Sequence, residues 1–442
     1  MSPGGLPLDA WRAELSRPSA DFFNRFAACA RAPEGARDAT REAIKGLVPV
    51  VDWAGYLPHL PSGLLGTWAV WRLRALLEEP SFLRLLATQL HAFAHEGRRV
   101  RGGLAGLVRG SGDWERAEGA MAGGRPAQAY AELLAVEAPE RGDFHRVLQL
   151  GAADMACMGQ KGTAAWFLGD LWERLDRPGA TGRRLLAIAG WLVAAEPVDR
   201  FWHQRAAARF PGAVPAIDCR RASRFDQQAA LAREVCDRGL VAMLDAFCGW
   251  MREGAGSGDL LSALALAAAE KLLDARRDLE GRTSGTLLHL AAVARGLAPL
   301  ARPEPYAQAA ALVNLFPTDE PEERIRARPP AAPAGQPAHD LLEAILDAEP
   351  AQAMHFADRL REAAGPEAVL RVLAEAASRN DPGFNHASQV LAVAGAAEVV
   401  PEVGAEAQAA LLAALAKSLA NGQGSSDLGR TADRALGGPA RL

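Results

Sequence analysis

Apolar residues recur at intervals of three and four along most of the chain, which is the spacing of one face of an α-helix. The stretch Leu64–Leu77 reads LLGTWAVWRLRALL, and Leu260–Leu273 and Leu287–Leu300 follow the same rule. Alternation with a period of two, which is typical of strands, is scarce. The pattern therefore predicts an all-α fold. Helices are also predicted over Phe82–Phe93, Ala127–Val136, Ala164–Leu175, Leu185–Ala195, Tyr306–Phe316, Leu341–Ile345, Val369–Ala377, Ser388–Ala396 and Ala405–Leu419.

One segment breaks the helical pattern over a long distance. Pro317–Ala338 reads PTDEPEERIRARPPAAPAGQPA, and its proline and charge content predict an extended or disordered linker. We therefore expect helical N-terminal and central modules over residues 1–316, a proline-rich linker over 317–338, a helical C-terminal module over 339–420, and a flexible tail over 421–442.

Four segments share a plan, in which a polar or glycine-containing turn with a His or Lys opens an apolar helix that a second apolar helix follows. Their spacing of roughly 90–130 residues is longer than a common solenoid unit. The plan predicts a repeat-like array of helical modules whose opening turns can converge. The segments are Gly55–Leu73, Met158–Leu175, Ser284–Leu300 and Asn380–Ala396.

Composition narrows the class of protein. The chain has 442 residues, 49% of them apolar, with a formal net charge of −4 and no basic excess that would indicate a nucleic-acid partner. Its five cysteines show no CxxC spacing, which argues against a disulfide framework and favours a reducing compartment. Residues 1–15 have no signal-peptide pattern, and no apolar stretch is long enough to span a membrane. We expect a cytoplasmic protein without a membrane or nucleic-acid partner.

The opening turns carry the first candidates for chemistry, namely His59, His289 and His386, with Lys161 in the remaining turn. Neutral imidazole at the start of a helix is a suitable ligand for Fe, Cu, Zn or Ni. Asp381 is a carboxylate that can complete such a set, although its place before Pro382 also suits turn initiation. Each histidine can instead cap a helix or lie on the surface.

Two further patterns carry weaker signals. Lys161 lies in GQKG beside Gln160, and a lysine at a buried helix start is a candidate base, Schiff-base amine or carbamylated ligand; the alternative is an exposed turn lysine. His91 and His95 form HAFAH, an i,i+4 pair that can chelate a metal but lacks the glutamate of HExxH.

Ten tryptophans accompany only three tyrosines. Those near the first two modules can either wall an aromatic ligand pocket or form interhelical core. No Walker loop, dinucleotide-binding GxGxxG or GxSxG elbow is present, and the glycine-rich Gly102–Gly112 is interpreted as a flexible loop. The tryptophans concerned are Trp53, Trp68, Trp71, Trp166, Trp172, Trp191 and Trp202.

The four modules resemble the questin oxidase-like family, a helical group that includes aromatic-polyketide oxygenases. The residues that carry the resemblance are GQKGTAAWFLGDLWERL with the following RRLLAIAGWLVAAEPVDRFW, then LLHLAAVARGL with PYAQAAALVNLF, and the turn NDPGFNHA. The resemblance implies a helical fold around a central cavity, oxidative cleavage of an aromatic ring, and iron held by histidines and, in some members, a modified lysine.

Position by position, His59 and His289 match family histidines and Lys161 matches the lysine of a GHK motif. Gln160 stands where that motif has His, and Asn380 stands near the place of another family His, with His386 six residues further on. These departures imply either a different ligand set or a pocket without a metal.

Three hypotheses follow. The first is an oxygenase-like enzyme for a small hydrophobic, aromatic natural-product intermediate, in which His59 and His289, with His386 or Asp381, hold Fe(II) or another divalent metal that activates dioxygen, while Lys161 or Gln160 orients the substrate or an oxyanion. The second is a non-enzymatic helical-repeat binding or scaffold protein with a tryptophan-lined groove. The third is a metal-free enzyme that uses Lys161 and buried histidines as acids and bases.

Overall fold

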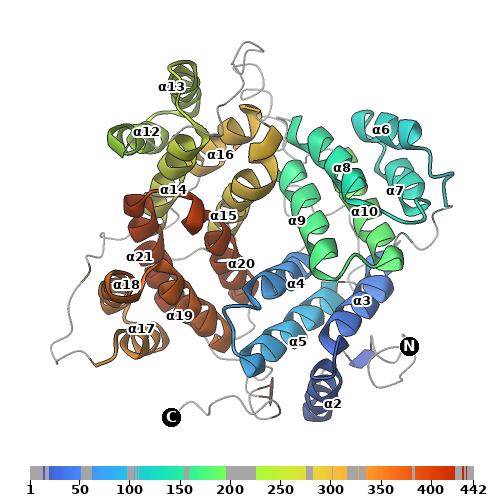
Figure 1. Ribbon diagram of the computed structural model, residues 1–442, viewed down its shortest axis with the longest axis horizontal. Coiled ribbons are helices and arrows are strands. Elements are labelled where there is room, and N and C mark those ends of the chain that lie inside the picture. The colour runs from blue at the N-terminus through green and yellow to red at the C-terminus, as the bar shows by residue number, and fades with distance from the viewer. Residues whose placement is uncertain are drawn as a thin grey trace. The chain divides into compact units, whose positions relative to one another are not determined.

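The computed structural model confirms the all-α class (Figure 1), since every helix or strand assignment within its described residues is helical. Within this described part, no helix combines the length and hydropathy needed to cross a bilayer. The central cavity implied by the family resemblance stays a prediction. The structure describes residues 13–14, 19–50, 62–96, 104, 107, 109–153, 159–195, 225–274, 282–300, 302–315, 327, 335–380, 384–423, 431–432 and 435.

Backbone contacts divide the chain into two compact units, which we call unit 1 and unit 2. Unit 1 comprises residues 1–74, 78–199 and 426–442, and unit 2 comprises residues 75–77 and 200–425. This boundary near residue 199 is not one that the sequence pattern indicated. The proline-rich segment instead falls inside unit 2, because α14 (Ser257–Asp274), which precedes it, packs directly against α21 (Ala405–Asn421), which follows it.

In unit 1, helix α10 has the largest number of closely packed helical neighbours. Helix α10 packs against α3, α6, α7, α8 and α9, and α9 also packs against α4 and α8. The helices of unit 1 are α2 (Ala20–Ala30), α3 (Gly35–Leu47), α4 (Ser62–Leu73), α5 (Glu79–Glu96), α6 (Trp114–Ala122), α7 (Pro126–Leu134), α8 (Arg141–Ala153), α9 (Gln160–Arg174) and α10 (Gly179–Ala194).

Unit 2 is built around two closely packed pairs, α15 with α20 and α14 with α21. The predicted helix Leu287–Leu300 is interrupted: α15 ends at Ala292, and the chain continues through the π-helical turn η6 (Val293–Leu297) and the 3₁₀ turn η7 (Ala298–Leu300). The remaining elements of unit 2 are α12 (Phe225–Asp237), α13 (Leu240–Arg252), α15 (Arg282–Ala292), α16 (Glu304–Asn314), α17 (Pro337–Leu346), α18 (Pro350–Ala364), α19 (Pro366–Arg379), α20 (Phe384–Val399) and the 3₁₀ turn η8 (Val400–Glu402).

Local chemistry accounts for several helix starts. The Ser19 hydroxyl accepts the Phe22 N–H at the start of α2, and the Asp113 carboxylate accepts the N–H groups of Glu115 and Arg116 at the start of α6. Helices α7, α17, α18 and α19 begin with proline, whose fixed φ and missing N–H suit the first turn.

The end of the glycine-rich stretch is held by a buried carboxylate from α7. Glu132 Oε2 accepts the backbone N–H groups of Ser111, Gly112 and Asp113 at 2.8, 3.0 and 3.3 Å and the Ser111 hydroxyl at 2.9 Å. Gly112 adopts a φ of +81°, which favours glycine. The backbone of residues 111–113 is therefore held against α7 by hydrogen bonds. At this end of Gly102–Gly112, the structure differs from the flexible loop that the sequence predicted.

Candidate functional site

Helix α9 carries Gln160 and Lys161 in its first turn. The helix begins after Gly159, whose φ of +81° places it in the left-handed region. Every residue from Lys161 to Leu168 is buried, so α9 is covered around its whole circumference in this part. A helix buried on all sides is a core element, so the polar groups at its start lie within the core of unit 1.

Lys161 is only 7% exposed, which contradicts the alternative of an exposed turn lysine. The side-chain oxygen of Gln160 is buried without a hydrogen-bond partner among the described residues. Leaving such an acceptor unsatisfied costs about 1–3 kcal/mol. The first turn of α9 therefore combines a buried amine with an amide oxygen that lacks a donor from the described chain.

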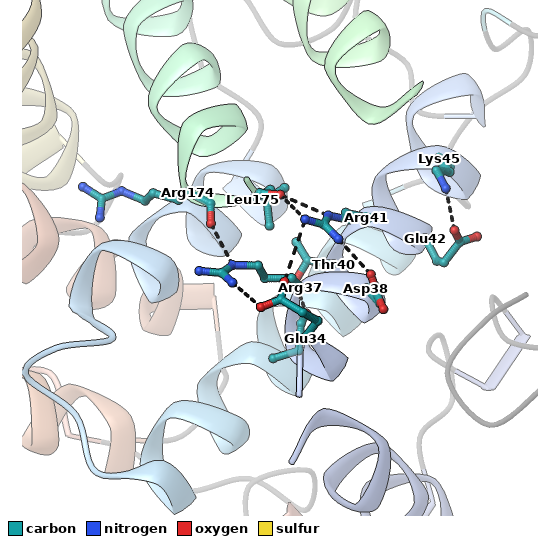
Figure 2. Close-up of polar contacts among 10 residues, drawn as sticks. Glu34, Arg37, Asp38, Thr40, Arg41, Glu42, Lys45, Arg174 and Leu175 are labelled. Atoms are coloured by element: carbon teal, nitrogen blue, oxygen red, sulfur yellow. Dashed lines mark hydrogen bonds and ion pairs between the residues drawn. The ribbon is translucent and has the colours of Figure 1, made fainter. Parts of the chain in front are cut away.

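The opposite end of α9 is capped by arginines from α3 (Figure 2). Arg41 donates from Nε and from its terminal nitrogen to the Leu175 carbonyl at 3.0 and 2.5 Å, and Arg37 Nε donates to the Arg174 carbonyl at 3.3 Å. Glu34 and Asp38 hold these guanidinium groups by ion pairs. Cations at a helix C-terminus satisfy the last carbonyls and complement the helix dipole.

Helix α4 fixes the middle of α9. The Trp68 indole N–H donates to Asp170 Oδ2 at 2.7 Å, and the same oxygen accepts Arg174 Nε at 2.6 Å. The Trp68 ring also meets the rings of Trp166 and Phe167 at centroid distances of 5.3 and 6.5 Å. The Asp170 carboxylate thus serves α4–α9 packing.

The tryptophans that the structure describes support the interhelical-core interpretation. Trp172 stacks on Phe144 at 5.0 Å, and the indole N–H of Trp71 donates to the Thr40 hydroxyl at 3.1 Å. Trp191 is half-buried and meets Tyr130 edge-to-face. Trp53 and Trp202 lie outside the described residues.

His289 lies in α15 of unit 2 and is 2% exposed. Its Nε2 is 3.1 Å from the backbone carbonyl oxygen of Pro305 at the start of α16. A carbonyl only accepts, so Nε2 carries the proton and the neutral ring has its lone pair on Nδ1. Metal-bound histidines commonly make this contact, which fixes the tautomer and the ring orientation. A satisfied core histidine has the same geometry.

The contact between α15 and α20 shows where His386 lies relative to His289. Gly395 of α20 faces the backbone of Leu287, and Arg295 pairs with Glu398, so the two helices run parallel. His386 precedes Gly395 by nine positions, roughly 14 Å along the helix. The point where α15 and α20 touch therefore lies close to His289. The backbone of His386 lies much nearer the start of α20, well removed from that point.

The other predicted ligands lie outside the described part of the chain. His59 and Asp381 fall in undescribed segments, and His386 and His95 lie in described helices without described side chains. Among the side chains that the structure does place, no three of His, Cys, Asp or Glu group closely enough to share a metal ion. The described residues thus supply single candidates, Lys161 with Gln160 in unit 1 and His289 in unit 2.

No family model matches the chain, and no curated protein and no solved structure matches it either. The resemblance to the questin oxidase-like family therefore rests on the sequence segments quoted above and stays a prediction.

Proposed function

We propose that this protein is an oxygenase-like enzyme that acts on a small hydrophobic, aromatic natural-product intermediate. The observation that carries the proposal is the first turn of α9, where Lys161 is buried and the Gln160 amide oxygen lacks a partner among the described residues. Such an arrangement suits a polar group on an otherwise apolar ligand, because the ligand's hydroxyl supplies the donor that the amide oxygen lacks.

These two side chains would orient the substrate. The Gln160 oxygen would accept a phenolic O–H, and the Lys161 ammonium would donate to a phenolate or to an oxyanion that develops on the ring. The first turn of α9 would therefore position the polar substituent of an electron-rich ring.

The proposal includes Fe(II) or another divalent metal, which would supply dioxygen activation when bound. His289 fits a ligand role in one respect, since the Pro305 carbonyl fixes the tautomer with the lone pair on Nδ1. The sequence offers His59, His386 and Asp381 as further candidates, of which His386 lies well removed along α20 from the level of His289. That ligand set is proposed from the sequence alone.

Elemental analysis of the freshly purified full-length protein tests the metal. We expect iron or another divalent metal in the wild type, loss of most of it in His289→Ala, and no loss in His145→Ala. His145 is a matched control because its ring lies on the exposed side of α8, near Gln149. Separate His59→Ala, His386→Ala and Asp381→Ala variants show which of the other candidates contribute.

A hydroxyanthraquinone serves as a probe of the ring-binding site. We expect it to quench tryptophan fluorescence and to bind more weakly to Gln160→Ala and Lys161→Met, and we expect oxygen consumption with oxidisable members of this class. Turnover that survives chelators indicates the metal-free enzyme. Absence of both binding and turnover across a panel of hydroxylated polycyclic aromatics contradicts the proposal and favours the non-enzymatic scaffold.

A further inference from the structure

The first turn of α9 is in backbone contact with a glycine of α8. A Cβ atom on Gly151 would lie 2.9 Å from the carbonyl carbon and oxygen of Lys161 and 3.0 Å from the nitrogen of Gly162. Carbon atoms in contact ordinarily keep about 3.5–4.0 Å apart. A larger residue at position 151 would therefore displace the backbone that carries Lys161, because no flexible side chain is available to move instead.

Unit 2 contains the same arrangement next to His289. A Cβ atom on Gly395 of α20 would lie 2.9 Å from the carbonyl carbon and oxygen of Leu287 and 3.1 Å from its Cβ. Leu287 precedes His289 by two residues in α15. The helices α8–α9 and α20–α15 are neighbours in Figure 1 and are among the most closely packed pairs of their units.

We propose that Gly151 and Gly395 are positioning residues for Lys161 and His289. This inference rests on the proposed function in treating each of these side chains as functional within its own unit. Because each glycine has no side chain, its helix (α8 or α20) can approach the backbone of the neighbouring helix (α9 or α15) within one turn of the candidate side chain. The site residue is thereby placed by rigid main-chain contact, and a misplacement of about 1 Å at a reacting group can lower a rate by roughly a hundredfold.

Other glycines of unit 1 provide matched controls. Gly142 lies in the same helix as Gly151, and a Cβ there would meet nothing within 4 Å. Gly63 of α4 abuts the backbone of Phe93 in α5 at 2.5 Å, so its substitution creates a comparable packing lesion at a different helix pair. Gly63→Ala therefore measures how lost stability affects labelling while the Gly151 contact stays intact.

The chain has only four lysines, Lys45, Lys161, Lys271 and Lys417, so amine acylation can be followed residue by residue. We would acylate the full-length protein with an N-hydroxysuccinimide ester, follow each lysine by mass spectrometry, and measure unfolding by urea. In Gly151→Ala we expect the rate at Lys161 relative to Lys45 to change at least about threefold, because displaced packing alters access to a 7%-exposed side chain. Gly142→Ala and Gly63→Ala should leave that ratio unchanged.

Unit 2 supplies an independent arm. Diethylpyrocarbonate labelling of His289 relative to the exposed His339 should change in Gly395→Ala but not in Gly249→Ala, whose Cβ would meet nothing within 4 Å. Unchanged labelling ratios in Gly151→Ala and Gly395→Ala overturn the inference. Failure of both variants to fold also overturns it, because the contacts would then be needed for the core as a whole.

Hydroxyanthraquinone affinity, measured in the same variants, separates the inference from the proposed function. A changed Lys161 labelling ratio together with weaker probe binding supports both. A changed ratio with unaltered affinity supports the placement of Lys161 by Gly151 and counts against a part for Lys161 in the proposed site.

Discussion

The Trp68 indole N–H donates to the Asp170 carboxylate at 2.7 Å, and this hydrogen bond joins two helices whose contacting residues are 102 positions apart. Trp68 is fully buried, whereas Asp170 is partly exposed. Removing the acceptor leaves a buried donor without its partner. We expect Asp170→Ala to lower the free energy of unfolding of unit 1 by about 1–3 kcal/mol.

Urea unfolding followed by hydrogen exchange in α4 and α9 measures this effect. Glu118→Gln is the control, since it removes an ion pair to Arg146 whose side chains are both about 40% exposed, and such surface pairs contribute only about 0–1 kcal/mol. Equal losses in the two variants would show that the Trp68–Asp170 bond contributes no more than a surface pair.

Glu132 predicts an acid-dependent loss of stability. Burial raises the pKa of its carboxyl, but the hydrogen bonds from Ser111, Asp113 and Gly112 outweigh that effect and hold the pKa below its ordinary value. A carboxyl whose pKa is lower in the folded state stabilises the protein above its unfolded pKa, and this contribution is lost as pH falls through the folded pKa. Glu132→Gln should therefore destabilise the protein at pH 7, with a difference from wild type that shrinks at acidic pH.

The amides of residues 111–113 report this effect directly, because they donate to Glu132. We expect their hydrogen exchange to accelerate in Glu132→Gln at pH 7. A stability difference that stayed constant from pH 7 to pH 3 would contradict the assignment to this carboxylate.

Arg41 predicts a stabilising effect specific to arginine. Its two donors reach one carbonyl, that of Leu175 at the end of α9, and its side chain is 18% exposed. Arg41→Ala should cost about 1–2 kcal/mol, and Arg41→Lys should recover only part of this because an ammonium cannot reproduce the planar fork. Thermal unfolding at low and high salt provides the measurement. Full recovery by lysine would show that charge alone is responsible.

Cys236 predicts low thiol reactivity. Burial raises its pKa to about 11, and Cys29, a half-buried residue of α2, serves as the reference thiol. Only the thiolate reacts, so iodoacetamide at pH 8 should alkylate Cys236 at least about tenfold more slowly than Cys29. Residue-resolved mass spectrometry in native buffer measures both rates. Alkylation in urea measures the intrinsic rates of the two thiols. Similar alkylation rates for Cys236 and Cys29 in both the native and the urea-unfolded protein would contradict the environment described for Cys236.

The helical class could be predicted from the sequence because the 3–4 spacing of apolar residues is a local property. Helix α14, for example, follows from Leu260–Leu273. Helices α3 and α8 were not among those predicted; the buried face of α3 consists largely of Ala, Thr and Gly, which give a weak apolar signal. The division near residue 199 depends on which helices pack together, and apolar periodicity does not report that.

The candidate site residues could also be predicted only in part from the sequence. The type and spacing of Gln160, Lys161 and His289 made them candidates, but the sequence left their burial open. The roles of Gly151, Gly395 and Pro305 were not foreseen, although a glycine inside a helical pattern is a recognised sign of close packing.

The sequence by itself determined that this chain is helical and that polar groups open several of its apolar helices, because the spacing of apolar residues is a property of neighbouring turns. The small number of lysines is likewise read directly from the sequence. Only the tertiary structure decided that Lys161 is buried, that the Pro305 carbonyl fixes the tautomer of His289, and that glycines press on the backbones beside both residues. These properties arise where residues distant in sequence meet, and they depend on distances between helices that no local pattern encodes.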